Sequence, residues 1–362
     1  MNNVPKYSLL YVLLAPVLLI PVVVMAVLLV RGSESEQFYN RALAAAANGD
    51  FALAVKSFER AGELGHAESY YSLARIYQSG SIAIPDRDQA IYANLLKASL
   101  HGSVPAAYEL GKLLLDSPEV DHAQAALYFR TAALGGHAKA QLALAELYEN
   151  GKGVEQSDVL AEEFYLQAAS GGDPEALTAL GVFYLKERNG NIDYSKAVRY
   201  LHEASEKNYP RAFTVLGYIC ENKPSANKAE AEKRAGSYYR RAAELLDPEG
   251  LTNYGDHLMR DNRPQEALRC YHQAADKLDF APAAHRLGMY FYQQKTPDHR
   301  RALHYFERAA ARGYAASWMN LSIMAESGQG AKVDLKRAKE CYSMAEKLGM
   351  PEAGKRLKIL AE

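Results

Sequence analysis

Cysteine, tryptophan and runs of like charge are all scarce in this 362-residue sequence. The three cysteines, Cys220, Cys270 and Cys341, cannot build a disulfide framework, and none stands in a CxxC pair that would indicate zinc. Acidic and basic residues are intermixed to a net charge of −1, so no basic run indicates binding to nucleic acid. These absences exclude a disulfide-stapled domain, and we expect no nucleic-acid partner. They leave the compartment open.

Local catalytic and metal-binding motifs are also missing. No HExxH is present, and His66, His101 and His137 recur at the interval of the repeat described below, which indicates a loop position rather than a metal site. The glycines of Asn150–Val154 (NGKGV) lie between two expected helices and not after a strand, as a phosphate loop requires. We therefore predict no enzyme, no cofactor and no metal, although a catalytic triad can be scattered through a sequence.

A single long apolar run is present, at residues 7–30. It carries no charge, and as a helix it spans about 36 Å, enough to cross a bilayer with some tilt. Lys6 and Arg31 flank it, as expected of ends at the headgroups. The run predicts a short tail and one transmembrane anchor within residues 1–31. The alternative is a signal peptide cleaved after Ala26, but the apolar run is longer than the usual ~7–15 residues of such a peptide and continues past Ala26.

The orientation of this anchor rests on few charges. Lys6 and the amino terminus lie on one side, and Arg31 and Arg41 on the other, so the positive-inside comparison is close to a tie. A short positive tail before an apolar run is typical of a signal anchor. We predict a single-pass protein of a bacterial inner membrane, with the C-terminal body in the periplasm; a cytoplasmic body is the alternative.

Small residues recur along the rest of the chain with a period. Pairs that begin with alanine return about every 36 residues, and a leucine followed by a small residue returns with the same drift in spacing. Two independent markers that drift together indicate an internal repeat. The pairs include Ala132-Ala133, Ala168-Ala169, Ala242-Ala243 and Ala309-Ala310, and the leucines include Leu110, Leu144, Leu180, Leu216 and Leu287.

Each marker lies on a helical stripe. Ala161, Tyr165, Ala168 and Ala169 stand at i, i+4, i+7 and i+8, on one face of a helix. The small residues let two antiparallel helices approach to about 8–10 Å, and the aromatic residue fills the gap between neighbouring repeats. Since one repeat cannot bury its apolar face alone, the repeats are expected to stack and share a core. Left-handed caps are expected after the second helices, at Gly135, Gly171 and Gly313.

The segment 140–172, AQLALAELYENGKGVEQSDVLAEEFYLQAASGG, resembles the Sel1-like repeat family, which is related to the tetratricopeptide repeat. The resemblance implies an all-α fold, a right-handed α-solenoid of about eight to nine helix-turn-helix repeats behind the N-terminal transmembrane helix. We predict a juxtamembrane linker at 32–37, a tetratricopeptide-like first unit at 38–65, a Sel1-like array at 66–350 and a capping helix at 351–362. The turn around 222–228 departs from the motif because it lacks the glycines.

The resemblance further implies an adaptor that assembles complexes, in bacteria often at the envelope. First helices usually line the concave face of a solenoid, and a partner would be an extended peptide or a helix laid along that groove. Large first-helix residues are the candidate anchors, although they can equally pack between repeats. They are Tyr70, Tyr108, Phe213, His285, Arg286, Trp318 and Asn320.

Two rival functions stay open. A tyrosine-rich groove could contact polysaccharide in an export or cell-wall machine, since Tyr occurs 25 times. Alternatively, the array could hold and regulate a membrane enzyme. The partner, the pathway and the oligomeric state are not encoded in any motif.

Overall fold

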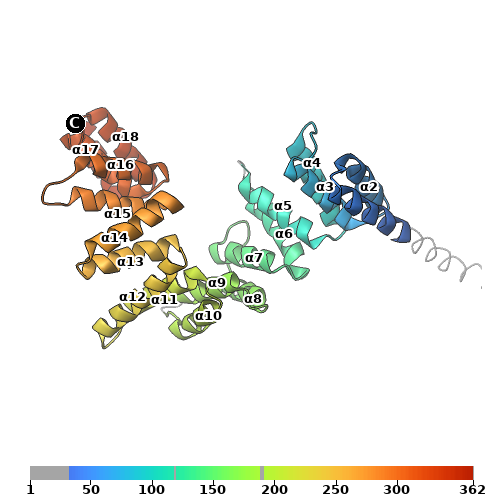
Figure 1. Cartoon of the computed structure of the whole chain (residues 1–362), viewed down its shortest axis with the longest axis horizontal. Helices are drawn as coiled ribbons and strands as arrows, with labels where there is room; N and C mark the ends of the chain where they lie inside the picture. The colour runs from blue at the N-terminus through green and yellow to red at the C-terminus, as the bar shows by residue number, and fades with distance from the viewer. Residues whose placement is uncertain (1–31, 118–119, 188–190, 362) are drawn as a thin grey trace, which may run out of the picture. The chain divides into compact units, whose positions relative to one another are not determined.

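The computed structural model describes residues 32–117, 120–187 and 191–361, and every element assigned in this part of the chain is helical (Figure 1). The predicted anchor at 7–30 lies outside the described residues. Among the residues described, no helix combines the length and apolarity that a membrane crossing requires. Residues 32–47 are helical, so the predicted linker at 32–37 falls within this helical stretch.

The chain forms two compact units, unit 1 at Met1–Gly171 and unit 2 at Gly172–Glu362. In unit 1, the helices after residue 47 are α2 (Phe51–Glu63), α3 (Ala67–Ser79), α4 (Arg87–Leu100), α5 (Val104–Asp116), α6 (His122–Leu134), α7 (Ala138–Asn150) and α8 (Asp158–Ala169). Unit 2 contains α9 (Pro174–Leu185), α10 (Tyr194–Glu206), α11 (Pro210–Asn222), α12 (Lys228–Glu244), α13 (Pro248–Arg260), α14 (Pro264–His272), the π-helical turn η1 (Gln273–Lys277), α15 (Ala281–Tyr292), α16 (His299–Ala311), α17 (Ala315–Ser327), α18 (Leu335–Lys347) and α19 (Pro351–Ala361).

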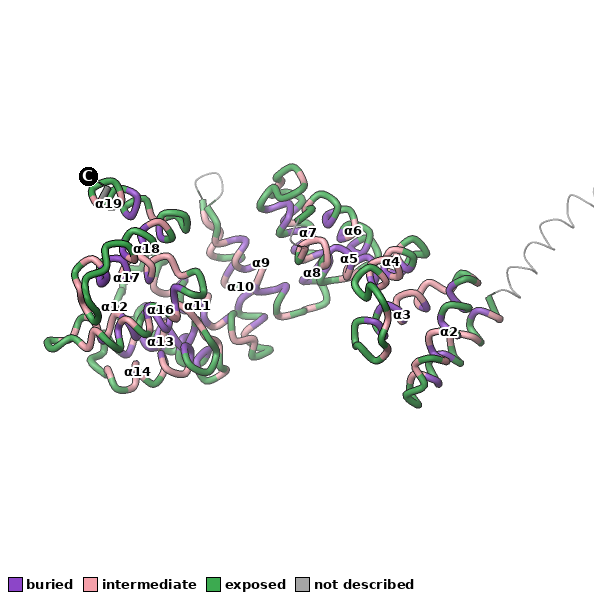
Figure 2. The backbone as a smooth tube through the Cα atoms, turned by 90° about the horizontal axis from the view of Figure 1, so that it is seen from above, coloured by how far each residue is buried: buried purple, intermediate pink, exposed green. Residues whose placement is uncertain are grey.

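The helices pair as the repeat predicts. From α3 to α7 in unit 1, and from α9 to α17 in unit 2, each odd-numbered helix is the first helix of a repeat and packs on the even-numbered second helix that follows. In unit 2, one cluster of buried residues runs from Ala243 on α12 to Cys341 on α18, so several repeats share one core. The buried segments in Figure 2 lie where helices of the same unit face one another.

Capping residues explain where the helices start. The second helices begin behind Asp121, Ser157, Asp193, Asn227 and Asp298, and each side chain accepts a hydrogen bond from the backbone N–H three residues on. Five first helices carry proline in the first turn, where a missing N–H costs no helical bond: Pro105, Pro174, Pro210, Pro248 and Pro282.

One backbone bond closes most loops from a second helix to the next first helix. The N–H of His137 donates to the carbonyl of Ala132 at 3.1 Å, and Tyr314 donates to Ala309 in the same way. This bond requires a left-handed residue just before the donor. Gly313 fills that place as predicted (φ +79°). In the loops at Gly135 and Gly171 the prediction was wrong by one residue, because the following glycines, Gly136 and Gly172, take the positive φ.

Two loops show how the array accommodates exceptions. Leu246 takes the left-handed position with φ +62°, a conformation that costs a branched side chain free energy. After α14, the turn η1 adds one residue to the helix, and the closing bond runs from Phe280 to Ala274, six residues rather than five. The repeat spacing therefore changes here while the loop keeps its closing bond.

The NGKGV segment is confirmed as a turn between helices. Gly153 has φ +69°, and a Cβ at this position would collide with the backbone of His122 and Ala123 at the start of α6. Glycine is therefore required by close packing of the turn on the preceding second helix, a structural reason that needs no phosphate.

Candidate binding surface

Hydroxyl–carboxylate pairs tie the two helices of a repeat together. The Tyr239 hydroxyl on α12 donates to Glu221 Oε2 on α11 at 2.8 Å, and the Tyr342 hydroxyl donates to Glu326 Oε2 at 2.8 Å. Burial raises the pKa of Tyr239, and the carboxylate it binds adds to the shift. These first-helix acids are therefore half-buried against the second helix of their own repeat.

Arginines from neighbouring repeats reach the same carboxylates. Arg260 binds Glu221, and Arg356 on the terminal helix α19 binds Glu326. The Arg356 guanidinium holds the pKa of Glu326 below its usual value. These contacts fix one repeat against the next, and they pair charges that remain partly exposed.

The first two predicted anchors lie between repeats of unit 1. The ring of Tyr70 stacks on His101 with ring centroids 5.7 Å apart, and Tyr108 stacks on His137 at 4.4 Å. Both tyrosines are half-buried. Their rings cover the loop histidines of the following repeat, so the structure places them as packing residues rather than as free anchors.

Phe213 and Trp318 are also half-buried. Trp318 on α17 packs against two clusters, the shared core of unit 2 and the smaller cluster under α19. Asn320, on the same helix, donates from Nδ2 to Met289 Sδ at 3.4 Å. Trp318 and Asn320 therefore join neighbouring repeats.

His285 and Arg286 are adjacent on α15 but face different surroundings. His285 is 6% exposed, and its Nδ1 lies 2.8 Å from Ser317 Oγ. Burial lowers the pKa of His285 to about 4. Arg286 is exposed and ion-pairs with Asp256, with Nη2–Oδ2 2.9 Å. Arg286 is the one exposed residue among the seven predicted anchors; the other six are half-buried or buried.

A row of exposed first-helix residues was missed by the sequence analysis. It includes side chains two residues after a marker leucine or its equivalent, a position at which Val182 and Asp256 are half-buried. In unit 2, Tyr218 is 54% exposed and Ile323 is 38% exposed, and Met289 is half-buried. A turn of 100° per residue explains the error. The side chain at +2 points away from the buried leucine, whereas the side chain at −3, where Tyr70, Phe213 and Trp318 lie, remains near it. We call Tyr218, Met289 and Ile323 the first-helix row.

In the described part of the chain, no group of three or more His, Cys, Asp or Glu side chains is close enough together to hold a metal ion. The three cysteines are free thiols. Burial raises the pKa of each of them, so none is an activated nucleophile.

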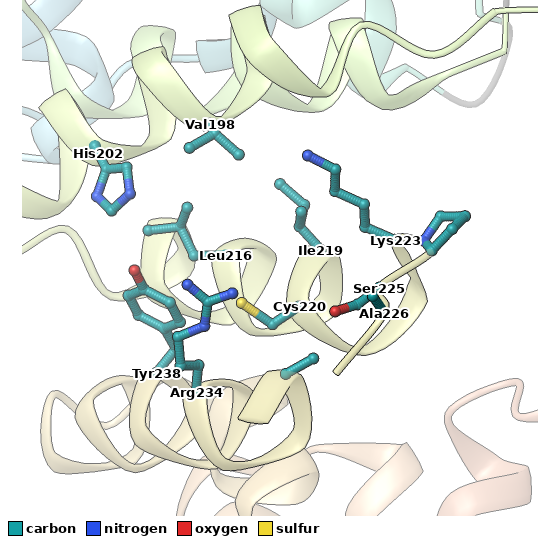
Figure 3. Close-up of a pocket in the computed structure, with 12 residues that line it drawn as sticks. Val198, His202, Leu216, Ile219, Cys220, Lys223, Ser225, Ala226, Arg234 and Tyr238 are labelled. Carbon is teal, nitrogen blue, oxygen red and sulfur yellow. The ribbon is translucent and has the colours of Figure 1, made fainter. Parts of the chain in front are cut away.

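One concave feature of unit 2 is a slot between repeats. It has a volume of about 450 Å³ and lies between α10, α11, α12 and the loop from Lys223 to Ala226 (Figure 3). The loop belongs to the repeat whose turn lacks the motif glycines.

Comparison with known families gives a consistent result. The family model described as Sel1 repeat matches 67–92, 104–137, 138–173, 174–209, 251–277, 281–314 and 319–350, which together make up more than half of the chain. Residues 210–250, which contribute most of the slot, are not among the matched segments.

Three curated relatives are 27–30% identical to this chain over the aligned residues. An uncharacterized protein of Neisseria meningitidis serogroup B is 27% identical over 65% of this chain and 49% of its own length. The chitin synthase regulator SKT5 of Saccharomyces cerevisiae is 29% identical over 50% of this chain and 27% of its own length. An exopolysaccharide production negative regulator of Rhizobium leguminosarum is 30% identical over 37% of this chain and 56% of its own length. The chain thus spans less than half of the first two proteins.

Solved structures match the fold. A protective antigen of uropathogenic Escherichia coli superposes with a TM-score of 0.62 at 23% identity, over 90% of this chain and 72% of that chain. A Sel1 repeat protein of Oxalobacter formigenes superposes with a TM-score of 0.55 at 24% identity, over 84% of this chain and 89% of that chain. At such identities these matches establish the helical repeat architecture.

Proposed function

Because the chain belongs to the Sel1 repeat family, whose members generally act as interaction scaffolds or regulators, we propose that it is a membrane-anchored adaptor that binds a protein partner along its first helices. Residues 7–30 would anchor it in a bacterial inner membrane, and the array would organise a complex on the periplasmic side. The apolar run in the sequence supports the anchor, and the helical repeats support the binding role.

The observation that carries this proposal is the first-helix row of unit 2. Tyr218 and Ile323 leave apolar surface exposed on first helices, as Met259 on α13 also does. Arg286, three residues before Met289 on α15, is exposed as well. Aromatic, aliphatic and arginine side chains provide most of the binding energy in protein interfaces, so this combination suits a peptide or a helix.

The test is proximity labelling from the carboxyl terminus in intact cells, which reports the neighbours and the side of the membrane together. The Tyr218→Ala/Ile323→Ala double variant should lose at least tenfold labelling of the main neighbour. Met344→Ala is the matched control, because Met344 has the same 38% exposure as Ile323 but lies on a second helix. Unchanged labelling by the double variant, or an equal loss in the control, would refute binding through the row.

A second candidate function is regulation of a polysaccharide-producing membrane enzyme, with or without direct contact to the glycan. The similarity to the chitin synthase regulator and to the exopolysaccharide regulator favours it. Purification in mild detergent should then yield a synthase in stoichiometric amount. A body that is retained on polysaccharide columns, and by no protein, would favour the glycan-contacting alternative over both protein-binding roles.

A further inference from the structure

The slot in unit 2 has the size and the lining of a small-ligand site. Its 450 Å³ falls within the roughly 300–1,000 Å³ usual for such sites. Val198, Leu216 and Ile219 line it with aliphatic carbon, and Leu216 and Ile219 are buried. Figure 3 shows side chains from α10, α11, the loop and α12 surrounding one space. The slot therefore offers an apolar wall to one part of a ligand.

The polar part of the lining is cationic. Lys223 and Arg234 line the slot together with His202, whereas no aspartate or glutamate does. All three are exposed at the rim, where they remain accessible to a solute. The Nζ of Lys223 lies 5.5 Å from the centroid of the Tyr194 ring, a cation–π contact. A guanidinium and an ammonium beside an apolar wall favour an anion with an aliphatic stem.

Another repeat of unit 2 shows what such an arginine binds. Arg337 on α18 ion-pairs with Glu307 on α16, the second helix of the preceding repeat. Counted back from the small pair of its own helix, Arg234 on α12 stands where Arg337 does on α18. Counted in the same way, His202 on α10 stands where Glu307 does on α16. In the slot, the position of the carboxylate is thus occupied by an imidazole.

Arg234 is left without an internal acid as a result. Within the described ranges no ion pair is formed by Arg234, although Arg260, Arg286 and Arg337 of the same unit each bind a carboxylate. The loop that opens the slot is also the part of the array that the family model does not match. His202, at the position of the missing carboxylate, and the loop of the next repeat therefore line the same slot.

We propose that this slot binds an exogenous carboxylate on a short aliphatic stem, with the carboxylate on Arg234 and Lys223 and the stem against Leu216 and Ile219. The ligand supplies the group that Glu307 supplies to Arg337. Its source is either a small organic acid or the free carboxyl terminus of a peptide, which share this chemistry. The inference does not depend on the proposed adaptor function, since it concerns other residues.

The experiment uses the full chain in mild detergent and measures binding by saturation-transfer NMR. The probes are hexanoate, its neutral isostere hexanamide, and acetyl-Ala-Ala-Leu with a free or an amidated terminus. Hexanoate should bind at least tenfold more tightly than hexanamide. Tighter binding of the free-terminus peptide than of hexanoate identifies a chain terminus as the source, and the reverse order identifies a small acid. Inorganic phosphate should bind more weakly than hexanoate.

Three variants separate the site from general effects. Arg234→Gln should weaken hexanoate at least tenfold, whereas Arg337→Gln, the equivalent arginine with its own acid, should not change it. His202→Glu should also weaken hexanoate at least tenfold, because it gives Arg234 an internal carboxylate, and this variant should unfold at a higher urea concentration. Equal binding of hexanamide, preference for phosphate, retention by Arg234→Gln, or absence of saturable binding would each overturn the proposal.

Discussion

The hydroxyl of Tyr239 and the carboxylate of Glu221 provide the sharpest test of how neighbouring helices are held in register. The ring of Tyr239 is 1% exposed, and the Glu221 side chain is 23% exposed. A hydrogen bond to a charged acceptor contributes about 1.5–3 kcal/mol. Since Glu221 keeps Arg260, we expect Tyr239→Phe to lower the free energy of unfolding by about 1–2 kcal/mol. Glu221→Leu should cost about 1–3 kcal/mol, because it leaves the tyrosine hydroxyl unpaired.

The double variant should recover part of this loss. Phe129 and Leu115 occupy the same two positions in an earlier repeat, so the chain already uses an apolar version of the pair. Urea unfolding followed by far-UV circular dichroism should show a coupling of at least about 1 kcal/mol between the two substitutions. Tyr218→Phe, at an exposed tyrosine of α11, is the control and should change stability by less than about 0.5 kcal/mol. Costs that add to within about 0.5 kcal/mol would refute the reasoning.

Three further predictions concern burial, the backbone and packing. His285 stays neutral in the fold, with a pKa of about 4 that lies below its unfolded value of 6.5, so the free energy of unfolding should decrease as the pH falls from 6.5 to 4. The urea midpoint should fall less steeply with pH in His285→Gln, and equal slopes would contradict this. Leu246→Gly should raise the unfolding free energy by about 0.5–1 kcal/mol by relieving the positive φ, with a lowered midpoint as the contrary result. Gly288→Val should cost at least about 2 kcal/mol, because a Cβ there lies 2.6 Å from a buried phenylalanine ring; Gly171→Ala, in open space, is the control, and equal midpoints for the two would count against close packing.

Much of the fold could be predicted because its determinants are local. The small pairs and marker leucines lie on helix faces whose geometry follows from 3.6 residues per turn, so the helices and their pairing could be read from spacing. The short interval between Ala242 and Ala274 was visible in the sequence, but the π-helical turn that follows α14 was not. That turn depends on how α14 packs on its neighbours.

The binding surface was harder to predict because size alone does not tell which face a residue occupies. Tyr70 and Trp318 are large and lie on first helices, yet they fill gaps between repeats. Tyr218 was overlooked although it follows a marker leucine at a fixed distance. The slot could not have been found from the sequence, since it depends on the space between α10 and α12.

The extra residue at Gln273–Lys277 separates two properties that usually change together, the length of a module and its docking on the modules beside it. An insertion of a single residue can be accommodated as a π-helical turn at the end of a helix, and the loop to the next helix still closes on the carbonyl of Ala274. Repeat proteins of this design can therefore gain or lose a single residue while the contacts between neighbouring repeats are kept. This tolerance gives each module room to develop a binding feature of its own.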